Sequence, residues 1–247
     1  MRSASMPDIL AKQLALDYCC APEDVKDAAN HFHIFSALDG RRRFDGDRAF
    51  KIAVINGKML CAGRTDIIAE LAERLQQMDG AWAFENDALR RLDEILARFG
   101  CRVGQVHLFF TAAQPTSVPE AAFDAVWYEH EQIAQFEADE RFCEAFAFYP
   151  DAPDVLGVAA VRSGEILGMA GASADSPYLW QIGVNTLPQA RGRGIAPALA
   201  AMLKNEILAR GKLPYYGTAV SHIASQRVAV KAGFLPAWAE LLSEEIV

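Results

Sequence analysis

Apolar residues recur every three to four positions in three segments of the first half of the chain. This spacing puts the apolar side chains on one face and predicts helices over residues 8–20, 67–78 and 88–99. Asp8, Thr65 and Asp87 stand where these helices begin, and their side chains suit a helix N-terminus. Residues 21–47, between the first helix and the next apolar run, read as irregular and polar.

Shorter apolar runs predict strands in the same half. Residues 50–55 and 59–62 flank Asn56-Gly57, a dipeptide that favours the tight turn of a β-hairpin. Residues 106–110 form a further short strand. We therefore expect residues 1–113 to form a smaller α+β domain of their own.

The second half has a different pattern. Two prolines and small polar residues make 114–119 the best candidate for a linker, and the Phe-, Trp- and Glu-rich residues 120–142 are expected to be helical. Three strands, a helix, a strand and a helix are then predicted over residues 155–161, 165–172, 178–184, 197–210, 215–220 and 225–231. Residues 120–247 are expected to form a second domain containing antiparallel hairpins.

Composition narrows the class of protein. The 247 residues carry a net charge of −8, so we expect neither nucleic acid nor an anionic membrane as a partner, because the two basic runs are short. Five cysteines without a C-x-x-C pair favour free thiols in a reducing cytosol. No segment approaches the roughly 18 uninterrupted apolar residues of a membrane span. Residues 1–8 lack the apolar core of a signal peptide, so a cytoplasmic location is expected.

The segment Arg191–Ala196, with the sequence Arg-Gly-Arg-Gly-Ile-Ala, joins a predicted strand to the long helix. The first turn of a helix has backbone N–H groups without intrahelical partners, and the helix dipole adds partial positive charge there. The glycines let the backbone approach a ligand closely, and the arginines add charge. The segment therefore predicts an anion site suited to a phosphate or pyrophosphate.

Two nucleotide-binding patterns do not fit this segment. A P-loop needs Lys followed by Ser or Thr after its last glycine, whereas Ile195 and Ala196 follow Gly194. A dinucleotide fingerprint needs a third Gly or Ala where Pro197 stands, and it needs a parallel strand–helix–strand unit. Both patterns are therefore excluded.

The segment matches in full the coenzyme A motif Gln/Arg-x-x-Gly-x-Gly/Ala of the GNAT superfamily of N-acetyltransferases. Downstream, Lys231–Phe234 resembles the Lys-x-Gly-Phe landmark that closes the domain in that superfamily. Residues 120–247 thus resemble a GNAT domain, which implies a mixed, mostly antiparallel sheet with flanking helices. The resemblance also implies an acyltransferase that uses acetyl-CoA or another acyl-CoA as co-substrate, without a metal.

The resemblance implies where acyl-CoA binds. The strand at 180–184 would part from the strand at 215–220, and the pantetheine arm would lie in the gap. The implied coenzyme A contacts are Ile182, Gly183, Val184, Arg191, Gly192, Arg193, Gly194, Ile195, Ala196, His222 and Ser225. The acceptor amine would attack the thioester directly, with its carbonyl polarised by a strand N–H group.

Two positions depart from the family pattern. Many relatives have an Asn where His222 stands, so His222 is a coenzyme A contact, a base near neutral pH, or a polar residue without a proton role. The tyrosine that many relatives use as thiolate acid aligns with Ala229, which cannot donate a proton. His222 is the catalytic candidate and the acid is left open. Three functions stay in view: an N-acyltransferase, a non-catalytic module that senses acyl-CoA or binds a partner, and a hydrolase or transferase acting on oxygen.

Other polar residues have simpler expectations. Residues near the acceptor side, expected mainly to be solvated or packed, are Glu129, His130, Glu131, Tyr178, Trp180 and Gln181. His31 and His33 alternate along the chain and could face one metal ion, but no carboxylate or cysteine completes a site, so no metal is expected. Arg41–Arg43 reads as a solvated loop, with contact to an anionic acceptor or the 3′-phosphate of coenzyme A as the alternative.

The acceptor is expected to be an amine on a small molecule or a peptide. Residues 1–113 match no motif. Three roles are possible for them: a lid over the acceptor site, a dimerisation surface, or a degenerate second transferase-like half. A homodimer would use such a dimerisation surface.

Overall fold

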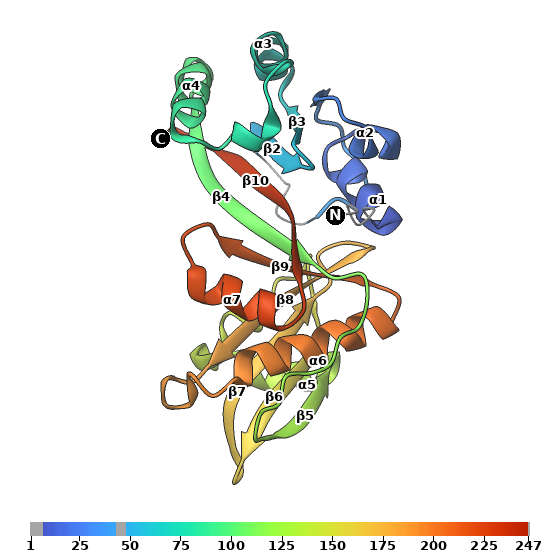
Figure 1. The fold of residues 1–247 in the computed structure, drawn as a ribbon, viewed down its shortest axis with the longest axis vertical. Helices are drawn as coiled ribbons and strands as arrows, with labels where there is room; N and C mark the ends of the chain where they lie inside the picture. The colour runs from blue at the N-terminus through green and yellow to red at the C-terminus, as the bar shows by residue number, and fades with distance from the viewer. Residues whose placement is uncertain (1–6, 43–47, 247) are drawn as a thin grey trace. The chain divides into compact units, whose positions relative to one another are not determined.

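The computed structural model describes residues 7–42 and 48–246, so Arg43 of the predicted basic loop lies outside the described residues. The chain forms two compact units (Figure 1). Unit 1 consists of Met1–Phe109 with Ala237–Val247, and unit 2 of Phe110–Pro236. The sequence pattern groups residues 237–247 with the second domain, whereas their contacts place them in unit 1.

Unit 1 contains a sheet with the strand order β1-β3-β2-β10-β4. Its strands are β1 (His31–Ile34), β2 (Phe50–Ile55), β3 (Lys58–Gly63), β4 (Cys101–Thr111) and β10 (Leu235–Glu245). Its helices are α1 (Asp8–Asp17), α2 (Pro22–Lys26), α3 (Thr65–Leu75) and α4 (Asn86–Leu96). The predicted β2–β3 hairpin is confirmed, with Asn56 and Gly57 at its turn both at positive φ.

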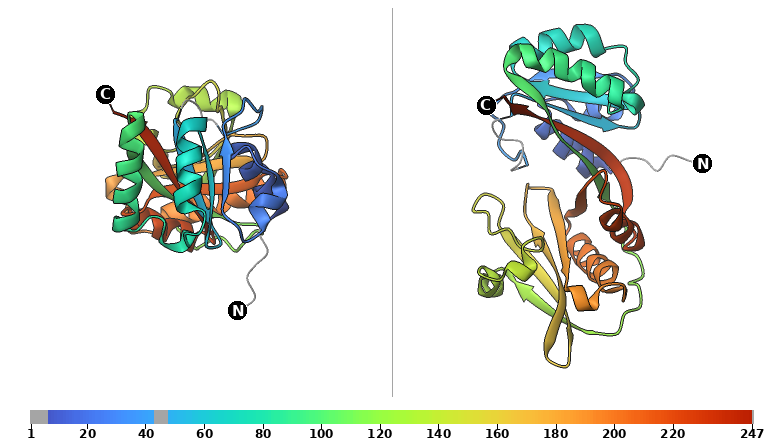
Figure 2. Two further views of the ribbon diagram at one scale, coloured as in Figure 1. Left: turned by 90° about the horizontal axis from the view of Figure 1, so that it is seen from above. Right: turned by 90° about the vertical axis from the view of Figure 1, so that its left-hand side faces the viewer.

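The two faces of this sheet are covered by different helices (Figure 2). Phe50 and Ile52 of β2 belong to the core cluster that also contains Leu71 of α3 and Ile95 of α4. The alternate residue, Lys51, points to the other face, where its Nζ lies 4.4 Å from the centre of the Tyr18 ring just after α1. The alternation of strand side chains therefore builds two layers of packing around one sheet.

Two strands and a helix of unit 1 differ from the sequence prediction. Residues 21–47 are not all irregular, because they contain α2 and β1. β1 has only four residues and takes its place by parallel pairing with β3. β10 was not predicted as a strand and pairs antiparallel with β2. Both strands pair with a strand that is distant in sequence, so the local pattern of apolar residues gives little indication of them.

Unit 2 contains the strand order β9-β8-β7-β6-β5. Its strands are β5 (Asp124–Glu129), β6 (Asp154–Arg162), β7 (Glu165–Ser173), β8 (Leu179–Thr186) and β9 (Leu213–Ala219). Its helices are α5 (His130–Ile133), α6 (Ile195–Ala209) and α7 (Ile223–Lys231). Strands β5 to β8 pair antiparallel and β8 with β9 parallel, so the predicted mixed, mostly antiparallel sheet with flanking helices is confirmed.

The helix predicted over residues 120–142 is wrong. The segment holds β5 at the edge of the sheet, then α5 and short 3-10 turns. Nearly all residues of β5 are exposed, so the strand lacks the alternation of buried and exposed positions that marks a half-buried strand. Pairing with β6 determines its structure.

The segment 114–119, predicted as a linker, lies within unit 2 and is anchored to it. The carbonyl of Thr116 accepts a hydrogen bond from the Asn205 side chain at 2.8 Å. The Nζ of Lys204 donates to the Thr116 hydroxyl and, at 2.8 Å, to the Ala232 carbonyl at the end of α7. Gly233 has a φ of 86°, and a Cβ there would lie 2.9 Å from Lys204 Nζ, so both conformation and space require glycine in this landmark.

Among the described helices, none is both long enough and apolar enough to cross a membrane.

Candidate active site

Strands β8 and β9, the pair at one end of the strand order of unit 2, part along their length. They are in register at three successive pairs, Leu179–Leu213, Trp180–Pro214 and Gln181–Tyr215. β8 then continues to Thr186 and β9 to Ala219, and no further pair between these two strands is found among the described residues. The parting leaves main-chain groups of both strands available to a ligand that lies between them.

The parted end of β8 leads into the N-terminus of α6. A 3-10 turn at Pro188–Ala190 follows β8, and Gly192 and Gly194 both have a φ of 77°. Gly194 is the N-cap of α6, and the first turn has neither a side-chain cap nor an acidic residue. The partial positive charge of the first turn is therefore uncompensated, and Arg191 and Arg193 beside it are exposed.

α6 itself is held rigidly. Ile195, Ala198, Leu199 and Leu203 are buried, and Ile195 lies against the backbone of β7, where a Cβ on Gly168 would be 3.1 Å from its Cγ2. The glycine-containing turn before α6 thus projects from a helix whose core face is fixed on the sheet, which keeps its N–H groups oriented.

Each of the parted strands carries a buried hydroxyl. The Oγ1 atoms of Thr186 on β8 and of Thr218 on β9 are buried, and neither has a hydrogen-bond partner among the described residues. Buried polar atoms are nearly always hydrogen-bonded, so two orphaned hydroxyls on the strands that part indicate a place for polar ligand groups. The sequence offered no signal for either residue.

Tyr216 is the first residue of β9 beyond the last pair with β8. Its side chain is buried, and its phenol oxygen lies 2.9 Å from the hydroxyl of Ser225 on α7. Burial raises the pKa of Tyr216, and the hydrogen bond with Ser225 opposes this rise in part. The phenol therefore stays protonated at neutral pH and can act as a proton donor.

The two positions that depart from the family pattern lie at opposite ends of α7. His222 is the N-cap of the helix and is exposed. Ala229 is fully buried, so its position could not hold a tyrosine without repacking. Ser225, four residues before Ala229, shares its helical face. The phenol of Tyr216 therefore reaches the same face of α7 from the opposing strand.

Gly183, predicted as a coenzyme A contact, packs closely against the protein itself. A Cβ at Gly183 would lie 1.7 Å from the Glu144 carbonyl oxygen, and a Cβ at Gly171, its partner on β7, would lie 2.0 Å from the Ala145 carbonyl oxygen. The side-chain oxygen of Asn185 accepts hydrogen bonds from the N–H groups of Glu144 (2.9 Å) and Ala145 (2.8 Å). A segment of backbone is therefore tied across this face of the sheet.

The residues expected on the acceptor side have specific partners. Glu129, predicted on a helix, ends β5 and accepts two hydrogen bonds from Arg210 at 2.6 and 3.0 Å, which lower the pKa of its carboxyl group. His130 donates from Nδ1 to the Asp154 carbonyl at 2.6 Å. These contacts make Glu129 and His130 structural.

On the central strands, Gln181 accepts a hydrogen bond from the Tyr215 hydroxyl at 3.1 Å, and Trp180 and Tyr178 are partly buried. Glu131 is exposed in α5. The hydrogen bond between Gln181 and Tyr215 thereby stabilises the last residue pair before β8 and β9 part.

The solvated loop predicted at Arg41–Arg43 is wrong for Arg42. Its guanidinium is buried in unit 1, donates to Asp17 Oδ2 at 2.6 Å, and also bonds to Glu240. The side chain therefore serves the core of unit 1.

The expectation that no carboxylate or cysteine stands near His31 and His33 is also wrong. Asp24 lies within ion-pair distance of both rings, and Cys20 lies beside Asp24 and His33. These residues all belong to unit 1.

Residues 118–237 match the GNAT acetyltransferase family. Residues 118–237 form a GNAT acetyltransferase domain. The matched region contains the parted strands, the α6 turn and Tyr216, and the N-terminal part of the chain has no recognised family. No curated protein matches the chain.

Two solved structures share the fold over nearly their whole length. A GCN5-related N-acetyltransferase-like protein from Streptococcus suis 89/1591 has 18% identity and a TM-score of 0.50, with 95% of this chain and 98% of that chain covered. A GCN5-related N-acetyltransferase from Kribbella flavida has 14% identity and a TM-score of 0.50, with 98% and 96% covered. The likeness therefore extends the shared fold beyond the GNAT domain to unit 1.

Proposed function

We propose that the protein is an N-acyltransferase that moves an acyl group from acetyl-CoA, or another acyl-CoA, to an amine by direct attack. The observation that carries the proposal is the uncapped N-terminus of α6 at the open end of two parted strands. A pyrophosphate fits the N-terminus of α6, because helix N-terminal N–H groups bind phosphate oxygens. The amide-rich pantetheine arm fits between the parted strands, because they offer unpaired main-chain groups.

The proposed coenzyme A contacts are those implied by the resemblance to the GNAT superfamily, with two additions. The turn Arg191–Ala196 would hold the pyrophosphate, and backbone groups of Ile182 to Val184 would pair with the pantetheine arm. The buried hydroxyls of Thr186 and Thr218, which have no partner among the described residues, would bond to its polar groups. Ser225 and His222 stand at the start of α7, where they would border the same ligand.

The transfer requires one bond to form and one to break. The amine nitrogen bonds to the thioester carbon and the carbon–sulfur bond breaks, so the nitrogen must lose a proton and the departing thiolate must gain one. We assign proton donation to Tyr216, whose phenol lies beside Ser225 on the helical face that Ala229 leaves without a donor. His222 is the candidate for a further coenzyme A contact or for the base.

The acceptor is an amine of a small molecule or peptide. The five free cysteines, at residues 19, 20, 61, 101 and 143, fit a reducing compartment, so we place the reaction in the cytoplasm.

Calorimetric titration with acetyl-CoA tests the binding half of this proposal. We expect Gly192→Asp to weaken binding about 100-fold, because a negative charge would stand against the pyrophosphate in place of charge-assisted hydrogen bonds. Gly211→Asp is the matched control. Gly211 lies just beyond the other end of α6, also has a positive φ, and also has nothing within 4 Å of a Cβ. Equal affinities of the two variants would show that the anion site is elsewhere.

Release of free thiol from acetyl-CoA, measured over amines, amino acids, aminoglycosides and peptides, tests the chemical half. Turnover with one class of amine supports the proposal and names the acceptor. Binding without turnover over the whole panel would favour an acyl-CoA-sensing module, which is the function that the buried Ala229 would fit.

A further inference from the structure

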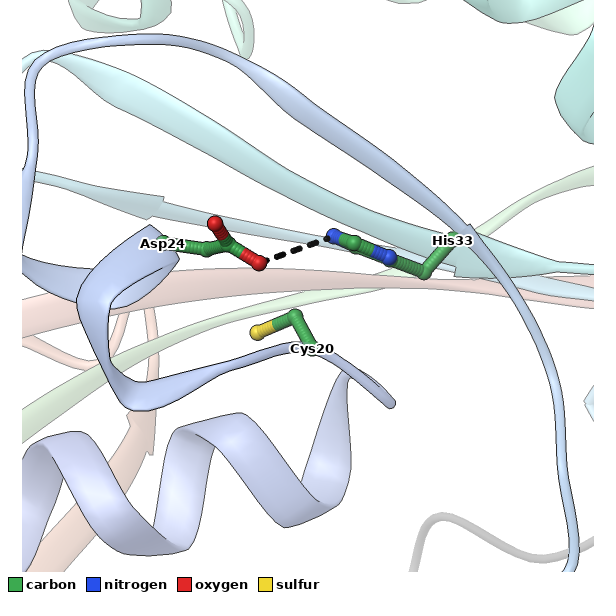
Figure 3. Close-up of side chains that lie close together, drawn as sticks. All are labelled: Cys20, Asp24 and His33. Atoms are coloured by element: carbon green, nitrogen blue, oxygen red, sulfur yellow. Dashed lines mark ion pairs between the residues drawn. The ribbon is translucent and has the colours of Figure 1, made fainter.

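Three elements of unit 1 bring a thiol, a carboxylate and an imidazole together (Figure 3). Cys20 follows α1, after Cys19 has turned the chain with a φ of 54°. Asp24 lies on α2, and His33 lies on β1. The Cys20 sulfur, a carboxylate oxygen of Asp24 and a ring nitrogen of His33 all lie within 4.8 Å of one another.

The backbone around the cluster is fixed. The Asp24 carboxylate accepts a hydrogen bond from the Ala21 N–H group at 3.0 Å, which holds the start of α2. β1 pairs in parallel with β3, and His33 stands opposite Ala62. All three side chains are partly buried. The cluster is therefore built into the fold and is not a chance meeting of mobile surface groups.

The ring of His33 has an unused nitrogen. Its Nε2 is buried and makes no hydrogen bond with any described residue, and it lies at ion-pair distance, 3.6 Å, from Asp24 Oδ2. In Figure 3 the Asp24 carboxylate and the His33 ring point toward each other, and Cys20 approaches from the loop below them. A buried nitrogen without a hydrogen bond is uncommon in folded proteins, so a metal ion at this point would complete the arrangement.

We propose that Cys20, Asp24 and His33 bind a single Zn²⁺ ion. Sulfur, imidazole nitrogen and carboxylate oxygen are the donors that Zn²⁺ takes in proteins, and three protein ligands with water in the fourth position form a common tetrahedral set. Bond lengths of about 2.0 to 2.3 Å put the donors of a tetrahedral zinc site about 3.5 Å apart. The donors here are at most 4.8 Å apart, so small side-chain movements would close the site.

A neighbouring group of donors surrounds this site and is not a second one. Asp24, Asp27 and His31 also lie within 4.8 Å of one another. However, the Asp27 carboxylate is paired with the Lys58 ammonium at 2.8 Å and with His31 Nε2 at 2.9 Å, so a cation already occupies that place. The His31 ring stacks on the His33 ring with centroids 6.0 Å apart. By stacking on the His33 ring, His31 would help to keep that ring in the orientation in which it faces the ion.

The ion would join the loop after α1, the short helix α2 and the four-residue strand β1. Both α2 and β1 are too short to be stable alone, and a shared ligand set would tie them to the rest of unit 1. The metal would therefore hold these three elements of unit 1 together.

Titration of the tag-free, metal-depleted chain with Co²⁺ tests this inference. Co²⁺ bound to a thiolate gives a near-ultraviolet charge-transfer band. We expect one Co²⁺ per chain with such a band, and loss of the band when Zn²⁺ displaces Co²⁺, because Zn²⁺ binds such sites more tightly. Cys20→Ser should abolish the band and weaken binding about 100-fold. Cys19→Ser is the matched control and should retain both, because the Cys19 thiol bonds to the Ser36 carbonyl outside the cluster.

Two further variants keep the test decisive if Cys20→Ser does not fold. Asp24→Asn and His33→Gln should each weaken Co²⁺ binding, with folding checked by circular dichroism. Zn²⁺ should raise the melting temperature of the wild-type chain and of Cys19→Ser, and not that of the ligand variants. Absence of Co²⁺ binding at millimolar concentration, a band that survives Cys20→Ser, or wild-type affinity in both Asp24→Asn and His33→Gln would overturn the proposal.

Discussion

The phenol oxygen of Tyr216 and the hydroxyl oxygen of Ser225 lie 2.9 Å apart, joining β9 to α7 beside the point where β8 and β9 part. Ser225 is one helical turn before Ala229, where relatives of the GNAT superfamily commonly carry their tyrosine acid. The phenol of Tyr216 therefore reaches this face of α7 from β9, whereas the tyrosine of the relatives would stand on the helix itself. This relationship makes the proton donor of the proposed reaction testable.

Tyr216→Phe should lower the turnover number about 100-fold or more, the usual range for loss of a general acid. Because burial raises the pKa of Tyr216, the phenol carries its proton at neutral pH, and activity should fall only at a pH above the usual titration range of tyrosine. That alkaline decline should be absent from the residual activity of Tyr216→Phe. A pH profile of both enzymes, with acetyl-CoA affinity measured in parallel, checks the assignment.

Ser225→Ala is the matched control for this prediction, since it keeps the phenol and removes its partner. The hydrogen bond between Ser225 and Tyr216 lowers the pKa of Tyr216, so the variant should shift the alkaline decline to higher pH and should lose far less activity than Tyr216→Phe. An unchanged pH profile in both variants would remove Tyr216 from the mechanism.

His222→Ala should weaken acetyl-CoA binding about 5-fold and leave the turnover number nearly unchanged. The reason is its place as the exposed N-cap of α7, where loss of one hydrogen bond to the ligand would cost about 1 kcal/mol. His222→Asn, which restores the amide common in relatives, should recover the affinity. Calorimetry and steady-state kinetics separate this role from a base, for which the turnover number would fall in both variants.

Asn185→Ala should destabilise unit 2 by about 2 kcal/mol, because the N–H groups of Glu144 and Ala145 lose their shared acceptor. Asn185→Asp keeps an acceptor oxygen in place and should retain most of the stability. Urea unfolding monitored by fluorescence compares the three proteins. Equal midpoints for the wild type and Asn185→Ala would mean that the two hydrogen bonds contribute little.

Arg42→Met should destabilise unit 1 by about 3 to 5 kcal/mol, because it leaves two buried carboxylates, Asp17 and Glu240, without their shared cation. Arg90→Met is the surface comparison. Arg90 pairs with Asp87 in an exposed bridge, whose loss should cost about 1 kcal/mol or less. Thermal unfolding of both variants checks the difference, and similar losses would contradict a buried ion-pair network.

The sequence predicted the elements whose structure depends on residues that are neighbours along the chain. The β2–β3 hairpin follows from Asn56-Gly57, and the tight turn before α6 follows from Gly192 and Gly194, because in each case neighbouring residues determine the backbone. The GNAT fold of residues 118–237 was recognisable for the same reason, since its two motifs are short and ordered along the chain.

Elements that depend on distant partners escaped prediction. β5 is an exposed edge strand whose structure is determined mainly by pairing with β6. The donors of the proposed zinc site come from three elements that approach one another only in the folded unit. Thr186, Thr218 and Tyr216 became site candidates because of their burial next to the parting strands, which no local pattern encodes. Chemistry assembled by tertiary contacts therefore had to be read from the structure.

The position of β10 has a consequence for synthesis of the chain. This strand lies between β2 and β4 in the sheet of unit 1, yet it follows the whole of unit 2 in sequence. A ribosome releases β2 and β4 long before the strand that separates them, whereas unit 2 is continuous and can fold as it emerges. During that interval the edges of β2 and β4 can pair with wrong strands. A chaperone would therefore matter most while unit 1 waits for β10 to be synthesised.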